Sequence, residues 1–117
     1  MTKLLVDTNF LIDVFRFSIG TSELDEYEIF TIEGVVKELR TLAEKRGEEG
    51  GCARLALKWL AEHAKVLNSE ANTDDAIVAA SKAGCIVATN DRELRERLKS
   101  TGVKTIYVRA RKHLELS

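Results

Sequence analysis

The sequence predicts an α/β fold, a three-layer α/β/α sandwich with a central parallel sheet of about five strands. Short apolar runs alternate along the chain with longer segments of helical periodicity. Strands that alternate with helices pair in parallel, and helices then cover both faces of the sheet. The composition agrees: 117 residues with 44% hydrophobic and 32% charged residues are typical of a single globular domain, which we expect over 1–117.

The strands are expected from local composition. Apolar runs at 4–6, 27–31 and 85–89 predict buried strands. Two weaker runs, at 65–68 and 103–108, have the β-branched content of strands. Together they give the five strands of the predicted sheet.

The helices fill the intervals between these strands. Glycine-rich residues 47–51 predict a flexible corner between the second and third helices. The apolar run 76–80 predicts that the fourth helix is deeply buried. In chain order, we expect helices at 9–17, 33–45, 52–64, 73–83 and 92–100.

Nothing in the sequence suggests a membrane or an oxidising compartment. The longest apolar runs are far below the roughly 18 residues that cross a bilayer, and Asp7 and Asp13 interrupt any signal-peptide core. Cys52 and Cys85 are too far apart to indicate a zinc site or a disulfide framework, and we expect both to be reduced. We therefore expect a cytoplasmic protein without a membrane partner.

The charge is unevenly distributed along the chain. The net charge is −1, but residues 92–113 hold eight basic residues and two acids. This segment therefore carries +6 and the remainder −7. A charged helix is often only a solvated surface, and the alternative is a basic strip that attracts a polyanion such as RNA. Its candidate RNA-binding residues are Arg92, Arg95, Arg97 and Lys99.

Acidic residues collect where the predicted strands end. Asp7 ends the first strand, Asp91 follows the strand at 85–89, and Asp74 and Asp75 open a helix. Because the carboxyl ends of parallel strands meet at one edge of a sheet, we expect these acids at one rim. Glu38 lies at the margin of the inward stripe of its helix, so it points either toward the sheet or into solvent.

Each carboxylate also has an ordinary structural explanation. Asp7 and Asp91 suit the N-terminal ends of helices, and an acidic first turn accounts for at least one of Asp74 and Asp75. These explanations would have to hold independently at one edge of one sheet. A carboxylate cluster is instead the donor set of a hard divalent cation, so the pattern predicts Mg²⁺ or Mn²⁺ rather than zinc.

Two other classes of acidic-pocket protein fit less well. A haloacid-dehalogenase-like phosphatase needs a second Asp two residues after the first, and Asn9 occupies that place. A phospho-receiver domain needs an acidic pair at the end of the first strand, which here ends on Asp7 alone. A covalent nucleophile is also not indicated, since Ser69 and Ser81 have no paired His.

Four motifs together resemble the PIN domain, a family of metal-dependent ribonucleases. They are "LLVDTNFLID", "VVKEL", "TDDAIVAA" and "IVATNDRELRERL", and the resemblance covers nearly the whole chain. The C-terminal motif is most similar to small-subunit ribosomal RNA-processing nucleases, whereas the first and third equally suit VapC-type toxins. The chain has no long insertion or zinc module, which argues against a large ribosome-assembly nuclease of the domain-plus-ribbon type.

The resemblance implies a set of site residues. Asp7 and Asp91 would be the main metal ligands, Asp75 a ligand or supporting carboxylate, and Glu38 a ligand through water or an orienter of the attacking water. Asp75 is preferred to Asp74 because the family's D-A-x-x-A-A run begins there. The implied catalytic and metal-binding acids are Asp7, Glu38, Asp75 and Asp91, and the supporting residues are Thr8, Asn9, Asp74, Thr89 and Asn90.

The predicted function is a Mg²⁺- or Mn²⁺-dependent endoribonuclease that cleaves single-stranded or structured RNA. The role is either ribosomal RNA processing or that of a VapC-type toxin with a cognate antitoxin, and the resemblance also implies a homodimer. The alternative is a catalytically degenerate PIN-like module that binds RNA or serves as a ribosome-assembly scaffold.

Overall fold

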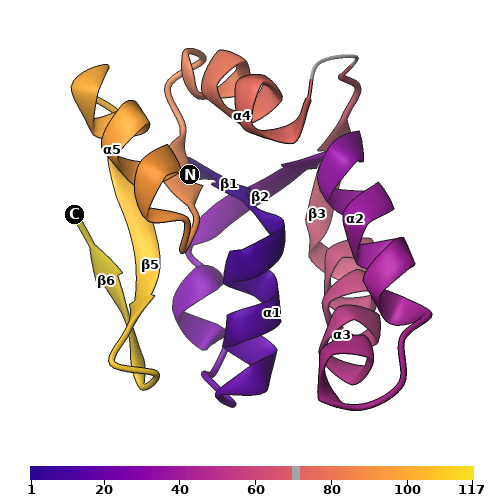
Figure 1. The fold of residues 1–117 in the computed structure, drawn as a ribbon. Coiled ribbons are helices and arrows are strands. Elements are labelled where there is room, and N and C mark those ends of the chain that lie inside the picture. Colours follow the sequence, from indigo (N-terminus) through magenta and orange to yellow (C-terminus); the bar gives the residue numbers. More distant parts are fainter. Residues whose placement is uncertain (70–71) are drawn as a thin grey trace.

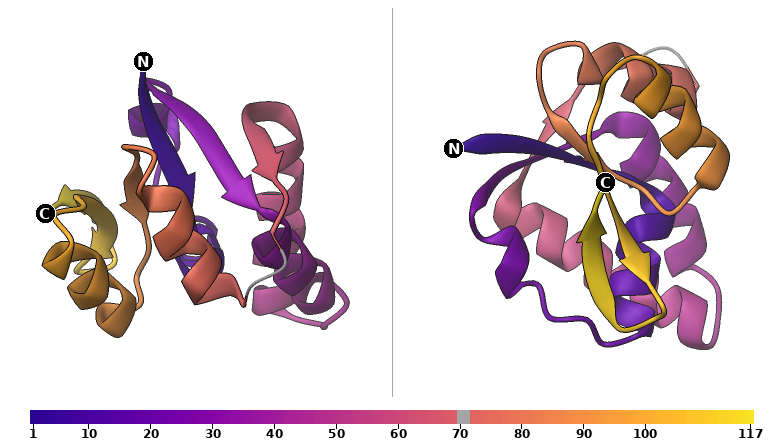
Figure 2. Two further views of the ribbon diagram at one scale, coloured as in Figure 1. Left: turned by 90° about the horizontal axis from the view of Figure 1, so that it is seen from above. Right: turned by 90° about the vertical axis from the view of Figure 1, so that its left-hand side faces the viewer.

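The chain folds around one sheet, with helices on both of its faces (Figures 1 and 2). The computed structural model describes residues 1–69 and 72–117. In this part of the chain, six strands pair in the order β3-β2-β1-β4-β5-β6. The strands are β1 (Thr2–Val6), β2 (Tyr27–Ile32), β3 (Ala64–Leu67), β4 (Ile86–Ala88), β5 (Thr105–Arg109) and β6 (His113–Leu116).

The first five strands confirm the predicted parallel sheet, and the sixth is an addition. Strands β1 to β5 pair in parallel, whereas β6 pairs antiparallel with β5. Residues 113–116 form only a short, partly exposed edge strand, and the apolar runs that mark buried strands are absent there. The hairpin turns at Ala110 and Arg111, whose φ angles of 55° and 58° are uncommon for residues other than glycine.

The helices divide between the two faces. Figure 2 shows α4 (Thr73–Ser81) and α5 (Arg92–Ser100) on one side of the sheet, and α1 (Thr8–Arg16) and α3 (Glu48–His63) on the other. Helix α2 (Glu33–Ala43) packs against α1 and α3. A short 3₁₀ turn, η1 (Ser22–Leu24), precedes β2. Within the described residues, none of the helices has the length and apolar character needed to pass through a membrane.

The glycine-rich segment is not the flexible corner that the sequence predicts. Helix α3 already begins at Glu48, and only Gly47, with φ of 86°, lies outside it. A Cβ on Gly50 would stand 1.9 Å from the carbonyl oxygen of Lys45. Glycine is therefore needed for the close approach of α3 to the preceding turn, although it is a poor helix former.

Helix α4 is also less buried than its composition predicts. Ala76 and Ile77 are buried against the sheet, but Ala79 is exposed. The small side chains on its outer side cover little apolar surface, so the helix needs no further layer above it. The centre of the core lies at β1, where Leu4, Leu5 and Val6 are almost completely buried.

The order of the strands fixes where a site can form. The chain leaves β1 toward β2 on one side, and it later enters β4 on the other side of β1. In open parallel sheets, a crevice forms beyond the carboxyl ends of the strands at such a reversal. Asp7 follows β1 and Thr89 follows β4, so both lie at this point.

Candidate active site

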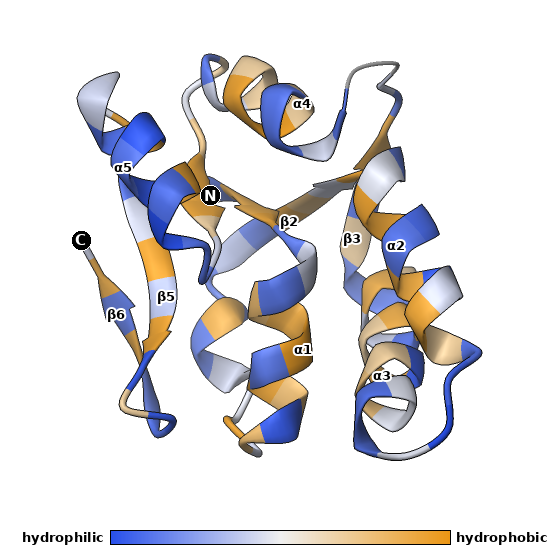
Figure 3. Ribbon diagram, in the orientation of Figure 1, coloured by the Kyte–Doolittle hydropathy of each residue, from blue (hydrophilic) through white to orange (hydrophobic). Residues whose placement is uncertain are grey.

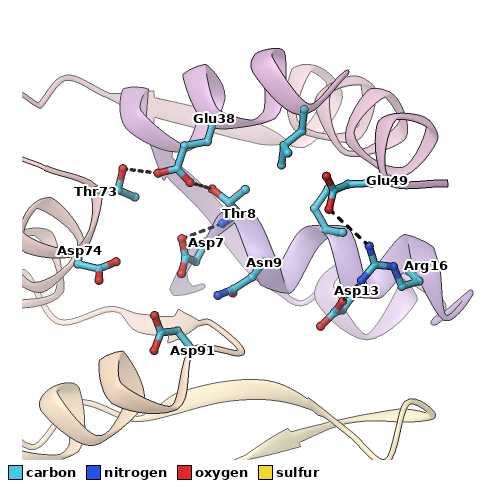
Figure 4. A pocket seen from close by; sticks show the side chains of 12 residues that line it. Asp7, Thr8, Asn9, Asp13, Arg16, Glu38, Glu49, Thr73, Asp74 and Asp91 are labelled. Carbon is cyan, nitrogen blue, oxygen red and sulfur yellow. Dashed lines mark hydrogen bonds and ion pairs between the residues drawn. The ribbon is translucent and has the colours of Figure 1, made fainter. Parts of the chain in front are cut away.

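A pocket of about 340 Å³ lies at this end of the sheet (Figure 4). It is enclosed by the starts of α1 and α4, the loop before α5, and one side of α2 and α3. Its lining contains Asp7, Thr8, Asn9, Ile12, Asp13, Arg16, Glu38, Leu42, Glu49, Thr73, Asp74 and Asp91.

Asp7 is the buried acid of the pocket, with 5% of its surface exposed. It caps α1, and its Oδ1 accepts a hydrogen bond from the Thr8 backbone N–H at 2.8 Å. Its Oδ2 accepts a second bond from the Thr89 hydroxyl, also at 2.8 Å. Burial, together with the smaller effect of the charges of Glu38 and Asp74, raises the pKa of Asp7 to about 6 in spite of these two bonds. The site therefore holds a carboxylate whose charge is incompletely compensated.

Glu38 reaches the pocket from α2 and is held by two hydroxyl groups. Thr8 Oγ1 donates to its Oε2 and Thr73 Oγ1 to its Oε1, each at 2.7 Å. The residue is exposed, yet Figure 4 shows its carboxylate directed to the pocket. From the margin of the helical stripe, the side chain thus reaches the starts of α1 and α4.

The two acids in the first turn of α4 point to different surroundings. Asp74 lines the pocket, and its pKa is raised by partial burial and by the charges of Asp91 and Glu38. Asp75 lies outside the pocket lining, where Arg97 donates to its Oδ1 at 2.9 Å and lowers its pKa. The structure therefore brings Asp74 together with the other acids, and it does not bring Asp75 there.

Asp91 completes the acidic rim. It caps α5 by accepting a hydrogen bond from the Leu94 backbone N–H at 3.1 Å. Its own backbone N–H donates to the Thr89 hydroxyl oxygen at 3.2 Å. Because the same hydroxyl donates to Asp7, Thr89 joins the loops that carry these two acids.

Two asparagines hold the loop between β4 and α5 against α1. The Asn90 backbone N–H donates to Asn9 Oδ1 at 3.0 Å. The Asn90 side chain donates to Asp13 at 2.7 Å and accepts from the Val108 backbone N–H at 2.8 Å. Asn9 and Asn90 therefore fix the shape of the rim, and the supporting role in catalysis that the family resemblance implies stays a prediction.

The far end of the pocket contains an ion-pair cluster that the sequence reasoning missed. Arg16 lies 3.4 Å from Asp13 and 3.2 Å from Glu48, and it also approaches Glu49. Asp13 lies in the second turn of α1, on the side that faces the pocket. The amphipathic pattern of α1 could have indicated that side, but the partners on α3 become known only from the fold.

The predicted basic strip is largely engaged in contacts within the protein. Arg97 pairs with Asp75, and the Arg95 guanidinium lies over the Tyr107 ring at 3.9 Å. Arg92 pairs with Glu96 on the same helix. Lys99 makes no ion pair with any residue in 1–69 or 72–117. Helix α5 is nevertheless strongly hydrophilic (Figure 3).

The acids do not form a closed set of ligands as they stand. Among the described residues, no three His, Cys, Asp or Glu side chains are close enough together to hold a metal ion. Both cysteines are free, Cys52 buried and Cys85 partly buried, and neither belongs to the pocket lining. The carboxylates thus line an open pocket without forming a complete metal site among themselves.

Comparison with known proteins identifies relatives of the whole chain. The family model described as a PIN-like domain matches residues 2–111. Ribonuclease VapC4 from Methanocaldococcus jannaschii is 34% identical, over 99% of the chain and 97% of that protein. Ribonuclease VapC9 from Archaeoglobus fulgidus is 37% identical, over 94% of the chain and 85% of that protein.

A solved structure shares the fold. It is a domain of a functionally unknown protein from Methanocaldococcus jannaschii, which superposes with a TM-score of 0.66. The match covers 94% of the chain and 93% of that structure at 22% identity. At this identity, the likeness concerns the fold alone.

Proposed function

The chain belongs to the family of PIN-like domains, and on this premise we propose that it is a divalent-metal-dependent endoribonuclease of the VapC type. The acidic pocket would hydrolyse phosphodiester bonds of single-stranded or structured RNA. The names of both curated relatives support a ribonuclease of this type, and neither name supports a role in ribosomal RNA processing.

One observation carries the proposal: a buried, incompletely compensated carboxylate, Asp7, faces further carboxylates across an open pocket. If a basic side chain neutralised these carboxylates, they would form an ordinary internal ion pair and need no bound cation. Arg16 lines the same pocket, but its partners are Asp13, Glu48 and Glu49 at the far end. Burial is the main cause of the raised pKa values of Asp7 and Asp74, and repulsion from neighbouring carboxylates adds to it. A bound cation would offset both effects, because it favours the charged form of each acid.

The donor set fits a hard divalent cation. Carboxylate oxygens are the ligands that Mg²⁺ and Mn²⁺ prefer, whereas zinc favours His and Cys. We propose that Asp7, Asp74 and Asp91 would hold the ion together with Glu38. When bound, it would supply positive charge to the transition state and lower the pKa of a coordinated water.

The neighbouring side chains would keep the acids in place. Thr89 donates to Asp7 and receives the Asp91 backbone N–H, so it fixes the distance between the two strand-end loops. The Thr8 backbone N–H holds the other oxygen of Asp7. Glu38 retains free lone pairs beside its two hydroxyl bonds, and it would orient the attacking water.

The proposed role also includes partners. A VapC-type ribonuclease acts within a toxin–antitoxin pair, so we propose RNA as the substrate and a cognate antitoxin protein as the inhibitor. The homodimer implied by the family resemblance stays a prediction. The basic face of α5, with Arg92 and Lys99 as its most available cations, would guide RNA toward the pocket.

The test is cleavage of a mixed single-stranded and structured RNA by the purified protein. The wild type should cleave with Mg²⁺ or Mn²⁺ and not with a chelator. Asp7→Asn should lower the rate by at least about 100-fold, because it removes a charged donor from the set. Asp25→Asn, at an exposed position outside the pocket lining, is the matched control and should leave the rate unchanged.

Equal cleavage by the wild type and Asp7→Asn would contradict the proposal. Failure of the wild type to cleave with either ion would contradict it as well. Binding of RNA without cleavage would instead favour the alternative, a degenerate PIN-like module that binds RNA or supports ribosome assembly.

A further inference from the structure

The Glu38 carboxylate connects the two helical layers at the rim of the pocket. Each of its oxygens accepts one hydroxyl, from Thr8 at the start of α1 and from Thr73 at the start of α4, both at 2.7 Å. Figure 4 shows Glu38 between these two threonines. An exposed glutamate is normally free to change rotamer. Two hydroxyls that hold opposite oxygens restrict that freedom.

Among residues 1–69 and 72–117, the hydroxyl of Thr73 donates to Glu38 alone. The N-cap of α4 is Asn72, whose Oδ1 accepts from the Asp75 backbone N–H at 2.9 Å. The hydroxyl of Thr73 is thus not needed for capping, and its hydrogen bond goes to Glu38. Thr73 also immediately precedes Asp74, so its position and that of the pocket acid are coupled through the backbone.

Gly34 leaves the space in which Thr73 makes this contact. It precedes Glu38 by four residues on α2, so both lie on the same face of the helix. A Cβ on Gly34 would stand 2.7 Å from Thr73 Oγ1, 3.6 Å from its Cβ and 3.7 Å from its Cα. Only the contact with the hydroxyl oxygen is too short. Gly34 is not among the glycines with positive φ, so space rather than backbone conformation explains the residue.

The Cβ of an alanine at position 34 would therefore clash with the hydroxyl oxygen of Thr73 and with no other atom of that residue. The cheapest relief is a rotation of the Thr73 side chain that moves Oγ1 away, because Cβ and Cα stay at ordinary contact distance. This rotation would break the hydrogen bond to Glu38. A methyl group on Gly34 is therefore expected to weaken or break the bond from Thr73 to Glu38.

We infer that Thr73 is a positioning residue, whose hydroxyl directs the Glu38 carboxylate into the pocket, and that Gly34 provides the room for it. The inference rests on the proposed ribonuclease function for its activity readout. In that reaction, the two hydroxyl bonds hold the Glu38 carboxylate in the orientation in which it would position the attacking water. Misplacing such a group by about 1 Å is enough to cost up to about 100-fold in rate.

The variants Thr73→Val and Gly34→Ala test the inference by different routes. Each should lower kcat for RNA cleavage by roughly 10- to 100-fold and change KM little, because the substrate contacts remain. The double variant should be no slower than the slower single one, since both remove the same hydrogen bond. Thr73→Ser, which keeps the hydroxyl, should retain most of the wild-type kcat.

Two substitutions serve as matched controls. Thr41→Val removes an exposed hydroxyl on α2, which donates to the Lys37 carbonyl and to no other group in the described part of the chain. Gly51→Ala adds a Cβ within α3, where the nearest atom is Arg54 Nη2 at an ordinary 3.8 Å. Both should leave kcat unchanged. Gly34→Ala should keep the thermal unfolding midpoint near that of the wild type, because the helix propensity of alanine offsets the loss of the hydrogen bond from Thr73.

A wild-type kcat in Thr73→Val would overturn the inference. So would losses of kcat in the double variant that equal the product of the two single losses. A lower kcat in Gly34→Ala that is explained by a lower unfolding midpoint would overturn it as well. Urea unfolding separates this outcome from failure of the proposed function. In a double-mutant cycle of Thr73→Val with Glu38→Ala, the two destabilisations should be non-additive even if the wild type cleaves no RNA. Additive values would show that the contact does not form.

Discussion

The carboxylate of Asp7 carries an electrostatic cost that its local structure does not remove. It accepts two hydrogen bonds and caps a helix, and these interactions favour the charged form. Burial outweighs them, so the pKa lies at about 6 instead of 3.8. A residue kept at such a cost is more consistent with a site for chemistry than with an optimised cap.

Replacing Asp7 with asparagine should therefore stabilise the protein at neutral pH. Because the folded-state pKa is raised, the stability that the protonated group contributes is fully present below about pH 3.8 and lost as the pH rises through about 6. The loss at pH 7 is about 3 kcal/mol. Asp7→Asn should regain about 1–3 kcal/mol, since asparagine cannot accept both existing hydrogen bonds.

Urea unfolding in the presence of a chelator measures this gain. It should be constant above about pH 7 and shrink as the pH falls toward 4. Asp25→Asn, at an exposed position, controls for the change of an acid to its amide. A variant that is less stable than the wild type at pH 7 would show that the hydrogen bonds to Asp7 outweigh its burial.

Helix α4 shows how one turn separates two adjacent carboxylates. Successive residues on a helix lie about 100° apart, so Asp74 and Asp75 cannot both face the pocket. Asp75 is drawn toward α5 by Arg97 and is bonded to Asn72, whereas Asp74 turns to the other acids. The contact of Arg97 on α5 with Asp75 on α4 therefore determines which of the two acids faces the pocket.

Matched amide substitutions on α4 test this orientation. Asp74→Asn should lower RNA cleavage by about 100-fold, as expected for a residue that holds the ion. Asp75→Asn changes the charge equally and should retain most of the activity, because its partner is Arg97. The opposite result would restore the motif-based assignment, in which Asp75 is the site residue.

At the level of elements, periodicity was sufficient for most of the fold. The five parallel strands and the helix at 92–100 occur where the hydrophobic pattern predicts them. The pattern did not reveal β6, whose partly exposed residues have no buried run, or the start of α3, whose Gly50 is required by the Lys45 carbonyl. Such features depend on contacts with residues distant in space or on backbone packing.

The candidate site shows the same division. The positions of Asp7 and Asp91 follow from the strand ends, so they could be predicted once a parallel sheet was expected. The orientation of Asp74 and the engagement of Arg97 could not, because each depends on the contact of Arg97 on α5 with Asp75 on α4. Catalytic roles for these residues stay predictions until the variants are measured.

The whole molecule combines an acidic pocket with a basic C-terminal segment. Residues 92–113 carry +6 within a chain of net charge −1. Since Arg97 is paired with Asp75 and Arg95 lies over Tyr107, substituting either would remove a contact within the protein as well as a surface charge. Arg92 and Lys99 are exposed on α5 and are the better probes of long-range attraction for RNA.

Binding of single-stranded RNA to the non-cleaving Asp7→Asn variant, measured over a series of salt concentrations, tests this attraction. Each lost phosphate contact should reduce the slope of log K against log salt by about 0.7, so adding Arg92→Ala and Lys99→Ala should flatten it by up to about 1.4. Lys37→Ala with Lys58→Ala removes the same charge from exposed positions on α2 and α3. Equal slopes in the two double substitutions would mean that net charge alone attracts the RNA, whereas flattening confined to the α5 pair would place the strand along α5.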